Sequence, residues 1–217
     1  MRLRKVKYAP MLLSANPRFV VNDPLSFRGR WTQAFPNHNQ CLHLEIGCGK
    51  GKFITEMAKS HPDLNFIALE RFDSVLVRVL EKLIKDPLDN LLLVCADAEQ
   101  LPSMFSKGEI SGLYLNFPDP WPKRRQAKKR LTTTKFLDMY SEIMADKGII
   151  RYKTDDFGFY HYSLLSFNKH PLLCITRQSL DLANSDIDNI TTEFEERFQK
   201  LGKPIFYLEA VNRRRLP

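Results

Sequence analysis

The chain has 217 residues and carries 33 Lys and Arg against 25 Asp and Glu, a formal net charge of +8. This length suits a single domain with one sizeable core. No apolar run is long enough to cross a membrane, and no hydrophobic signal segment follows the basic first residues, so the sequence argues against a membrane protein and a secreted one. The excess of positive charge favours a polyanionic partner.

The cysteines Cys41, Cys48, Cys95 and Cys174 form no C-x-x-C pair. Disulfide-rich secreted proteins and structural zinc sites place their cysteines in paired spacings, so this pattern argues against both. We therefore expect free thiols, a cytoplasmic protein and no bound metal.

Residues 1–40 show no sustained periodicity, and we expect a basic N-terminal arm there, followed by one domain over residues 41–217. Short apolar runs then alternate with stretches of helical period, which is typical of a mostly parallel sheet with helices on both faces. The last two runs flank a charged helical stretch, and we expect them to form an antiparallel hairpin at the sheet edge. The expected strands cover residues 41–46, 65–70, 91–97, 112–117, 148–154, 171–182 and 204–211, and the expected helices cover 51–60, 73–85, 132–145 and 156–168.

A glycine-rich segment, L-E-I-G-C-G-K-G-K-F, follows the first expected strand and precedes a helix. Gly47 and Gly49 allow the backbone to approach a ligand at the carboxyl end of the strand, where doubly wound sheets bind their ligands. The spacing matches neither the G-x-G-x-x-G of dinucleotide sites nor the phosphate-binding loop, because Lys52 is followed by Phe53. A nucleoside without phosphates fits this loop better.

Acidic residues end the next two expected strands. Glu70 stands where a carboxylate would hold a ribose diol, and Asp97 with Ala98 stands where an adenine edge would lie. Each feature alone has a simpler interpretation, since glycines make tight turns and carboxylates cap helices. The features together, in strand order, favour a nucleoside-binding site.

The segment E-I-G-C-G-K-G, followed by Glu70 and Asp97, resembles the S-adenosylmethionine site of class I methyltransferases. Within that class, Y-L-N-F-P-D-P-W-P-K-R-R, K-T-D on the fifth strand and T-T-E-F-E-E-R-F near the C-terminus resemble the bacterial tRNA (guanine-N7)-methyltransferase family. The resemblance implies a Rossmann-like α/β fold, with a mostly parallel seven-stranded sheet, an antiparallel edge hairpin and helices on both faces. It also implies methyl transfer from S-adenosylmethionine to N7 of guanine 46 in the variable loop of tRNA.

The resemblance also implies roles for individual residues. It assigns Glu45, Glu70 and Asp97 to the cofactor and places Asp119 at the reaction centre. Phe194 stands where the family usually has tyrosine, so this chain lacks the hydroxyl at that position. The residues assigned to the substrate are Lys123, Asp155, Thr192, Glu193, Phe194 and Glu195.

The chemistry of guanine N7 suggests what Asp119 does on its turn between Pro118 and Pro120. N7 has a lone pair and no proton, so it attacks a sulfonium methyl without a base, and the enzyme acts mainly by positioning. The attack moves positive charge onto the purine. We expect Asp119 to stabilise that charge and orient the guanine rather than accept a proton. The simpler interpretation is a turn residue in a Pro-Asp-Pro bend.

A run of basic residues follows Asp119, and we expect it to bind tRNA phosphates beside the site. Taken alone, such a run is usually a solvated face. Trp121 either stacks on the target base or packs the loop against the sheet. The residues expected to bind RNA are Arg124, Arg125, Lys128, Lys129 and Arg130, with Arg2, Arg4, Lys5 and Lys7 of the arm extending the same track.

Two other functions remain open at this point. N-F-P-D-P-W is similar to the Asn/Asp-Pro-Pro-aromatic motif of methyltransferases that act on an exocyclic amine, although the doubled proline is missing. A non-catalytic RNA-binding module with a vestigial cofactor pocket is the second alternative, and the intact set of Gly47, Gly49 and the strand-end acids argues against it. Both a monomer and a homodimer are compatible with the sequence.

Overall fold

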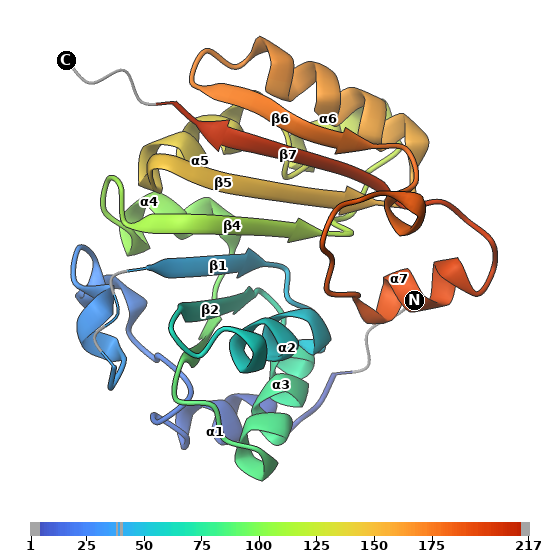
Figure 1. Ribbon diagram of the computed structural model, residues 1–217. Helices are drawn as coiled ribbons and strands as arrows, with labels where there is room; N and C mark the ends of the chain where they lie inside the picture. Colours follow the sequence, from blue (N-terminus) through green and yellow to red (C-terminus); the bar gives the residue numbers. More distant parts are fainter. Residues whose placement is uncertain (1–4, 38, 40, 214–217) are drawn as a thin grey trace.

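A seven-stranded sheet with strand order β3-β2-β1-β4-β5-β7-β6 forms the centre of the molecule (Figure 1). The computed structural model describes residues 5–37, 39 and 41–213. Strands β1 to β5 are parallel, and β7 runs antiparallel to both of its neighbours. The strands are β1 (Leu42–Ile46), β2 (Asn65–Glu70), β3 (Leu91–Cys95), β4 (Ile110–Asn116), β5 (Met144–Thr154), β6 (Leu173–Ser179) and β7 (Phe206–Asn212).

Helices cover both faces of this sheet, as the alternating pattern predicts. One hydrophobic cluster joins the sheet to α4, α5 and α6, and a second joins it to α1, α2 and α3 (Figure 1). At Gly51, which precedes α2, an added Cβ would lie 2.6 Å from a methyl group of Val79 on α3, so only glycine permits this close packing. The helices are α1 (Ala9–Ser14), α2 (Lys52–Ser60), α3 (Asp73–Lys85), α4 (Leu101–Met104), α5 (Thr134–Ile143), α6 (Phe157–Lys169) and α7 (Glu193–Gln199).

The N-terminal segment, for which the sequence predicts a basic arm, lies against the domain. From residue 5 it packs along the domain, and Val20 pairs with Leu93 at the outer edge of β3. The Trp31 side chain is fully buried and donates its indole N–H to the Met104 carbonyl at 2.9 Å. Its helices are short, namely α1 with six residues and the 3-10 helices η1 (Pro24–Phe27) and η2 (Trp31–Ala34) with four each, so no sustained periodicity develops. Arg2 and Arg4 lie outside the described residues, and Lys5 and Lys7 are exposed.

The C-terminal part forms the expected antiparallel hairpin at the sheet edge, with β7 inserted between β5 and β6. The charged helical stretch becomes α7, which lies beyond the carboxyl ends of the parallel strands (Figure 1). A capping box starts this helix: the Thr192 hydroxyl accepts from the Glu195 N–H, and the Glu195 carboxylate accepts from the Thr192 N–H. The hairpin therefore returns the chain to the edge where the loops after β1 to β5 meet.

The cysteines are free thiols, and only Cys48 is buried. Among the described residues, no helix is long and apolar enough to span a membrane. The same part of the chain contains no group of three or more His, Cys, Asp or Glu side chains arranged to hold a metal ion.

Candidate active site at the carboxyl edge of the sheet

The glycine loop after β1 has an open side. Gly47 and Gly49 have φ values of +74° and +57°, in the left-handed region that favours glycine. An added Cβ at either position would meet no atom of the described chain within 4 Å. The Gly47 N–H is bound to the Leu69 carbonyl at 2.8 Å, which ties the loop to the end of β2. The loop thus leaves room for a ligand and is itself held in place.

Glu45 is a buried carboxylate at the end of β1, with 2% of its surface exposed. Its Oε1 accepts from the Asn116 side-chain amide at 2.8 Å. Its Oε2 is buried and has no hydrogen-bond partner among the described residues. Burial raises the pKa of Glu45 to about 7, against the opposing effects of Asn116 and Lys153. A buried acceptor without a donor is costly, so this oxygen fits a ligand that brings an N–H or O–H.

Glu70 ends β2 and is also buried. Its carboxylate accepts from the backbone N–H of Phe72 at 3.1 Å and of Gly49 at 3.3 Å. Burial raises the pKa of Glu70, and these backbone donors oppose the rise. Because a carboxylate has about four acceptor positions, two N–H groups leave capacity for a ribose diol. The contact with Gly49 brings two of the expected cofactor residues together.

Asp97 and Ala98 follow β3. The Asp97 side chain caps the 3-10 helix η3 (Ala98–Gln100) by accepting from the Glu99 N–H at 2.9 Å, so its helix-capping interpretation is realised. The rest of the exposed Asp97 carboxylate is open to a ligand, and Ala98 is buried. The Ala96 N–H donates to the Glu70 carbonyl at 3.2 Å, which joins this loop to Glu70.

Asp119 lies on a strained turn after β4. Phe117 and Trp121, on either side of it, have φ values of +50° and +41°, which are unusual for residues other than glycine. The Phe117 N–H donates to the Lys153 carbonyl at 2.9 Å and joins the turn to β5. Asp119 itself is exposed, whereas Pro118 and Pro120 on either side of it are half-buried. The turn therefore presents a carboxylate at the strand edge, shortly beyond Asn116.

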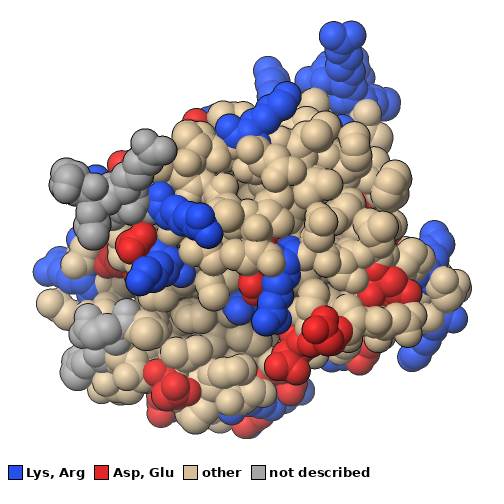
Figure 2. All heavy atoms as spheres, turned by 45° about the horizontal axis from the view of Figure 1, so that its top comes forward, with Lys and Arg blue, Asp and Glu red and all other residues tan. Residues whose placement is uncertain are grey.

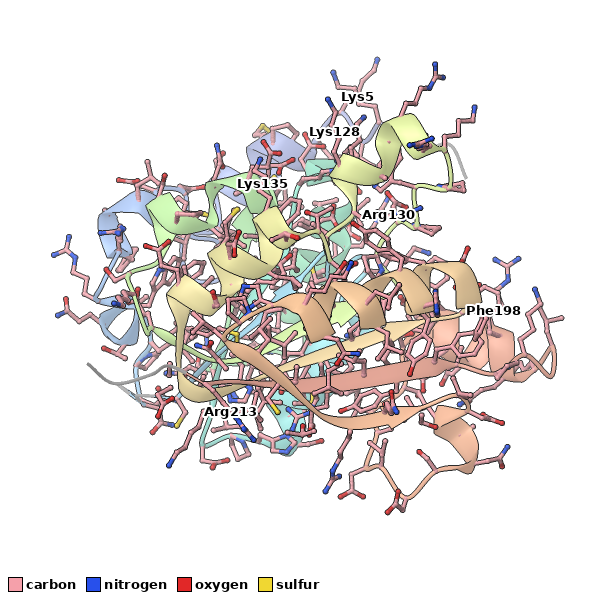
Figure 3. All side chains as sticks on the ribbon, turned by 90° about the horizontal axis from the view of Figure 1, so that it is seen from above. Lys5, Lys128, Arg130, Lys135, Phe198 and Arg213 are labelled. Atoms are coloured by element: carbon pink, nitrogen blue, oxygen red, sulfur yellow. The ribbon has the colours of Figure 1, made fainter. Side chains whose placement is uncertain are left out.

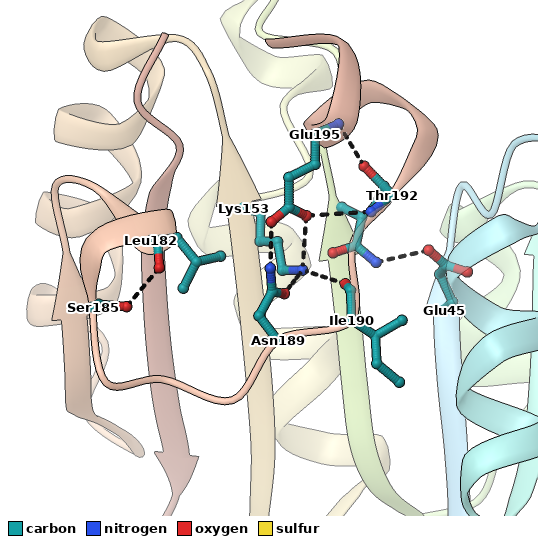
Figure 4. Close-up of polar contacts among 9 residues, drawn as sticks. Glu45, Lys153, Leu182, Ser185, Asn189, Ile190, Thr192 and Glu195 are labelled. Carbon is teal, nitrogen blue, oxygen red and sulfur yellow. Dashed lines mark hydrogen bonds and ion pairs between the residues drawn. The ribbon is translucent and has the colours of Figure 1, made fainter. Parts of the chain in front are cut away.

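Lys153 on β5 is a site residue that the sequence reasoning missed. Its side chain is 5% exposed and donates to Glu195 Oε2 at 3.2 Å, to the Ile190 carbonyl at 3.0 Å and to the Asn189 side chain (Figure 4). Desolvation lowers the pKa of Lys153, and the Glu195 carboxylate opposes this. The sequence signal for such a pair is a lysine within the expected strand G-I-I-R-Y-K-T, because a charged residue in a central strand is rarely buried without a partner.

The T-x-x-E segment that the resemblance assigns to the substrate divides into two kinds of residue. Thr192 and Glu195 are buried and engaged in the capping box and the Lys153 pair. Glu193 and Phe194 are exposed. The Phe194 ring stacks on Phe117 with centroids 6.1 Å apart, so this segment lies against the Asp119 turn.

Helix α7 also contacts the helices that follow the cofactor loops. Glu193 pairs with Lys82 of α3 at 3.8 Å, and Glu196 pairs with Lys52 of α2. These pairs are partly exposed and contribute little to stability. Together with the Phe194–Phe117 contact, these pairs show that α7 extends from the helices after the cofactor loops to the Asp119 turn.

The basic run after Asp119 forms the 3-10 helix η4 (Arg124–Lys129), with Lys123 as its exposed N-cap. Lys and Arg side chains are the uppermost projections in Figure 2, whereas Asp and Glu side chains are concentrated in its lower half. The Lys129 ammonium lies 4.9 Å from the centre of the half-buried Trp121 ring, which belongs to no hydrophobic cluster of the described chain. The exposed residues of η4 are Arg124, Arg125, Lys128 and Lys129.

Two expected residues occupy different settings from the rest. Asp155 is half-buried and directly follows β5, at the same edge as the other strand-end groups. Arg130, expected to bind RNA, is half-buried and donates to the backbone carbonyls of Pro120 and Trp121. At the carboxyl edge of the sheet, Glu45 contacts Asn116 and Glu70 contacts Gly49. Arg130, in contrast, contacts the backbone of the Asp119 turn.

Comparisons with known proteins agree with this architecture. A family model described as a putative methyltransferase matches residues 39–208. Among curated proteins, the tRNA (guanine-N(7)-)-methyltransferase of Geobacillus kaustophilus is 49% identical over 97% of this chain and 97% of its own length. That of Bacillus velezensis is 46% identical over 97% and 96%. That of Listeria monocytogenes is 45% identical over 97% and 98%.

Solved structures show the fold. The 16S rRNA methyltransferase KamB is 17% identical, with a TM-score of 0.58 over 80% of this chain and 88% of its own. A precorrin-6y C5,15-methyltransferase from Geobacter metallireducens is 13% identical, with a TM-score of 0.55 over 97% and 92%. The strand-end constellation, the family model and the near full-length relatives lead to one conclusion: the chain belongs to the bacterial tRNA (guanine-N7)-methyltransferase family.

Proposed function

We propose that this protein transfers the methyl group of S-adenosylmethionine to N7 of guanine 46 in the variable loop of tRNA. The observation that carries the proposal is the hydrogen bond between Asn116 and Glu45. This bond connects the strand that leads into the Asp119 turn with a buried carboxylate whose second oxygen has no hydrogen-bond partner among the described residues. The names of the curated relatives support tRNA and guanine N7 as the substrate.

The residues at the strand edge fit S-adenosylmethionine. The unpartnered Glu45 Oε2 suits a donor such as the cofactor's ammonium group, and Glu70 suits the ribose hydroxyls. Gly47 and Gly49 give the ligand room above the loop. Asp97 and Ala98 border the place of the adenine. When bound, the cofactor supplies a methyl group made electrophilic by the sulfonium charge.

The reaction forms a carbon–nitrogen bond from the N7 lone pair while the carbon–sulfur bond breaks and its electron pair stays on sulfur. No proton moves in this step. Asp119 acts as a fixed charge beside the guanine, which becomes cationic as the methyl arrives. Its position on a turn bounded by Pro118 and Pro120 limits the motion that would weaken this effect.

Substrate contacts come from residues around that turn. Lys123, Asp155 and the exposed Glu193 and Phe194 are the proposed substrate residues. Thr192 and Glu195 act through the position of α7, because their polar atoms are engaged within the protein. Arg124, Arg125, Lys128 and Lys129 bind tRNA phosphates.

The wider assignments follow from this function. A tRNA substrate and four free thiols suit a cytoplasmic enzyme, acting as a monomer or a homodimer. No step of the proposed reaction calls for a metal ion.

The deciding experiment measures transfer of labelled methyl from S-adenosylmethionine to unmodified tRNA, followed by identification of the modified nucleoside. We expect 7-methylguanosine, absent when guanine 46 is replaced by adenine. A product methylated on an exocyclic amine would indicate the amino-methyltransferase alternative. Tight tRNA binding with no transfer would indicate the non-catalytic RNA-binding module.

A further inference from the structure

Arg130 directly follows η4 and lies between the Asp119 turn and helix α6 (Figure 3). Its Nε donates to the Pro120 carbonyl at 2.9 Å, and its Nη2 donates to the Trp121 carbonyl at 3.2 Å. The guanidinium lies 4.4 Å from the centre of the Tyr162 ring and 5.7 Å from that of Phe159, both on α6. One side chain therefore connects two successive carbonyls of the turn to a helix in the core.

The turn has a physical need for such a contact. Phe117 and Trp121 hold left-handed φ values of +50° and +41°, and residues in this region persist only where surrounding structure enforces them. The Phe117 N–H is fixed by the Lys153 carbonyl on the near side of Asp119. On the far side, Arg130 fixes the carbonyls of Pro120 and Trp121. Asp119 lies between these two anchors.

The geometry of Arg130 is less suited to a phosphate. Its Nε and Nη2 already donate to backbone oxygens, and one face of the guanidinium covers an aromatic ring. Arg124, Arg125 and Lys128 of the same run are exposed and make no hydrogen bond or ion pair within the described chain, so they are free for phosphates. The basic run therefore contains two kinds of residue.

We propose that Arg130 is a positioning residue that holds the Asp119 turn in its reactive shape, rather than a contact to tRNA. The proposal rests on the proposed role of Asp119. Only arginine supplies a planar fork that donates to two carbonyls while it stacks on an aromatic ring, so lysine preserves the charge but not the function. Misplacement of a reacting group by about 1 Å costs on the order of a hundredfold in rate.

The test compares Arg130→Lys with wild type, and uses Arg177→Lys as the matched control because Arg177 is exposed on β6. Single-turnover methyl transfer is measured at saturating tRNA and cofactor, together with the salt dependence of tRNA binding. We expect Arg130→Lys to lower the rate about tenfold to a hundredfold with unchanged tRNA affinity and salt slope. Arg177→Lys leaves both unchanged.

A second pair of variants probes the same anchor without changing any charge. Tyr162→Leu removes the ring beneath the guanidinium, whereas Tyr162→Phe retains it, so only the leucine variant should slow transfer. Thermal unfolding and cofactor affinity by calorimetry identify variants that have lost their fold. If Arg130→Lys is unfolded, the Tyr162 pair decides the question.

Two results would overturn the proposal. One is a wild-type single-turnover rate in both Arg130→Lys and Tyr162→Leu. The other is an Arg130→Gln variant with a normal rate at saturation and a log-log salt slope reduced by about 0.7 to 0.9, which would identify a phosphate contact. Analysis of the wild-type product distinguishes a failure of the Arg130 proposal from a failure of the proposed function. If the wild-type product is not 7-methylguanosine, the proposed function is wrong, and the ratio of the Arg130→Lys rate to the wild-type rate still tests whether Arg130 holds the turn.

Discussion

Lys153 and Glu195 form an ion pair in which the two side chains are 5% and 0% exposed, with Nζ and Oε2 3.2 Å apart. The pair connects the carboxyl end of β5 to the first turn of α7, across 42 residues of sequence. Asn189 completes it by contacting both members (Figure 4). The position of α7 over the strand edge depends on this contact, because the other ion pairs of the helix are partly exposed.

Replacing Lys153 with Met leaves the Glu195 carboxylate buried without its counter-charge. Removing one partner of a buried pair costs about 3–5 kcal/mol, so we expect the free energy of unfolding to fall by about that amount. The double variant Lys153→Met, Glu195→Gln removes both charges and should restore much of the stability. Urea denaturation of the single and double variants measures this. A Lys153→Met protein within about 1 kcal/mol of wild type would show that the pair is not important for stability.

Glu45 makes stability depend on pH. Its pKa is raised from 4.5 to about 7 by burial, so the folded protein binds more protons than the unfolded chain between these values. Glu45 therefore contributes about 3 kcal/mol to the free energy of unfolding below pH ~4.5, and this contribution is lost as pH rises through about 7. His43, with a pKa lowered to about 4, acts in the opposite direction below pH ~6.5.

The Glu45 contribution is isolated by comparison with Glu45→Gln. We expect the free energy of unfolding of cofactor-free wild type, minus that of Glu45→Gln, to decrease between pH 5 and pH 8. His43 is present in both proteins and cancels in the difference. A difference that stays constant or increases with pH would contradict the raised pKa.

Asp119→Asn keeps the shape of the side chain and one acceptor oxygen but removes the charge. We expect the single-turnover rate to fall on the order of a hundredfold, with a much smaller change in tRNA affinity. Because no proton is transferred, the wild-type rate should be flat through neutral pH. A rate that rises tenfold per pH unit there, or a fully active Asn variant, would rule out this role for Asp119.

Neutralising Arg124, Arg125 and Lys128 together should flatten the salt dependence of tRNA binding. The log-log slope should decrease by about 0.7 to 0.9 for each phosphate that the variant no longer binds. Cofactor affinity, measured by calorimetry, should barely change. A control triple at Lys107, Lys169 and Arg177 removes the same charge from other positions on the surface. Equal slopes for the two triple variants would show that η4 is only a solvated face.

Local sequence patterns were sufficient to predict much of this fold. Apolar runs of strand length alternating with helical periods predicted the parallel sheet, and two late apolar runs predicted the antiparallel edge hairpin. The glycine loop with Glu70 and Asp97 at successive strand ends was recognisable because parallel strands end at a common edge. Each strand, helix and loop pattern depends on residues near one another in the chain, and the common edge of a parallel sheet then brings the strand ends together.

The contacts that define the site are different, because each joins residues from distant parts of the sequence. Asn116 with Glu45, Lys153 with Glu195, and Arg130 with the ring of Tyr162 are set by strand order and helix packing. Sequence alone predicted Arg130 as an RNA contact, since a basic residue in a basic run is indistinguishable from its neighbours. Arg130 is half-buried and donates to the carbonyls of Pro120 and Trp121. A charged side chain that packing partly shields from water needs acceptors inside the protein, and only the folded chain determines which side chains are shielded.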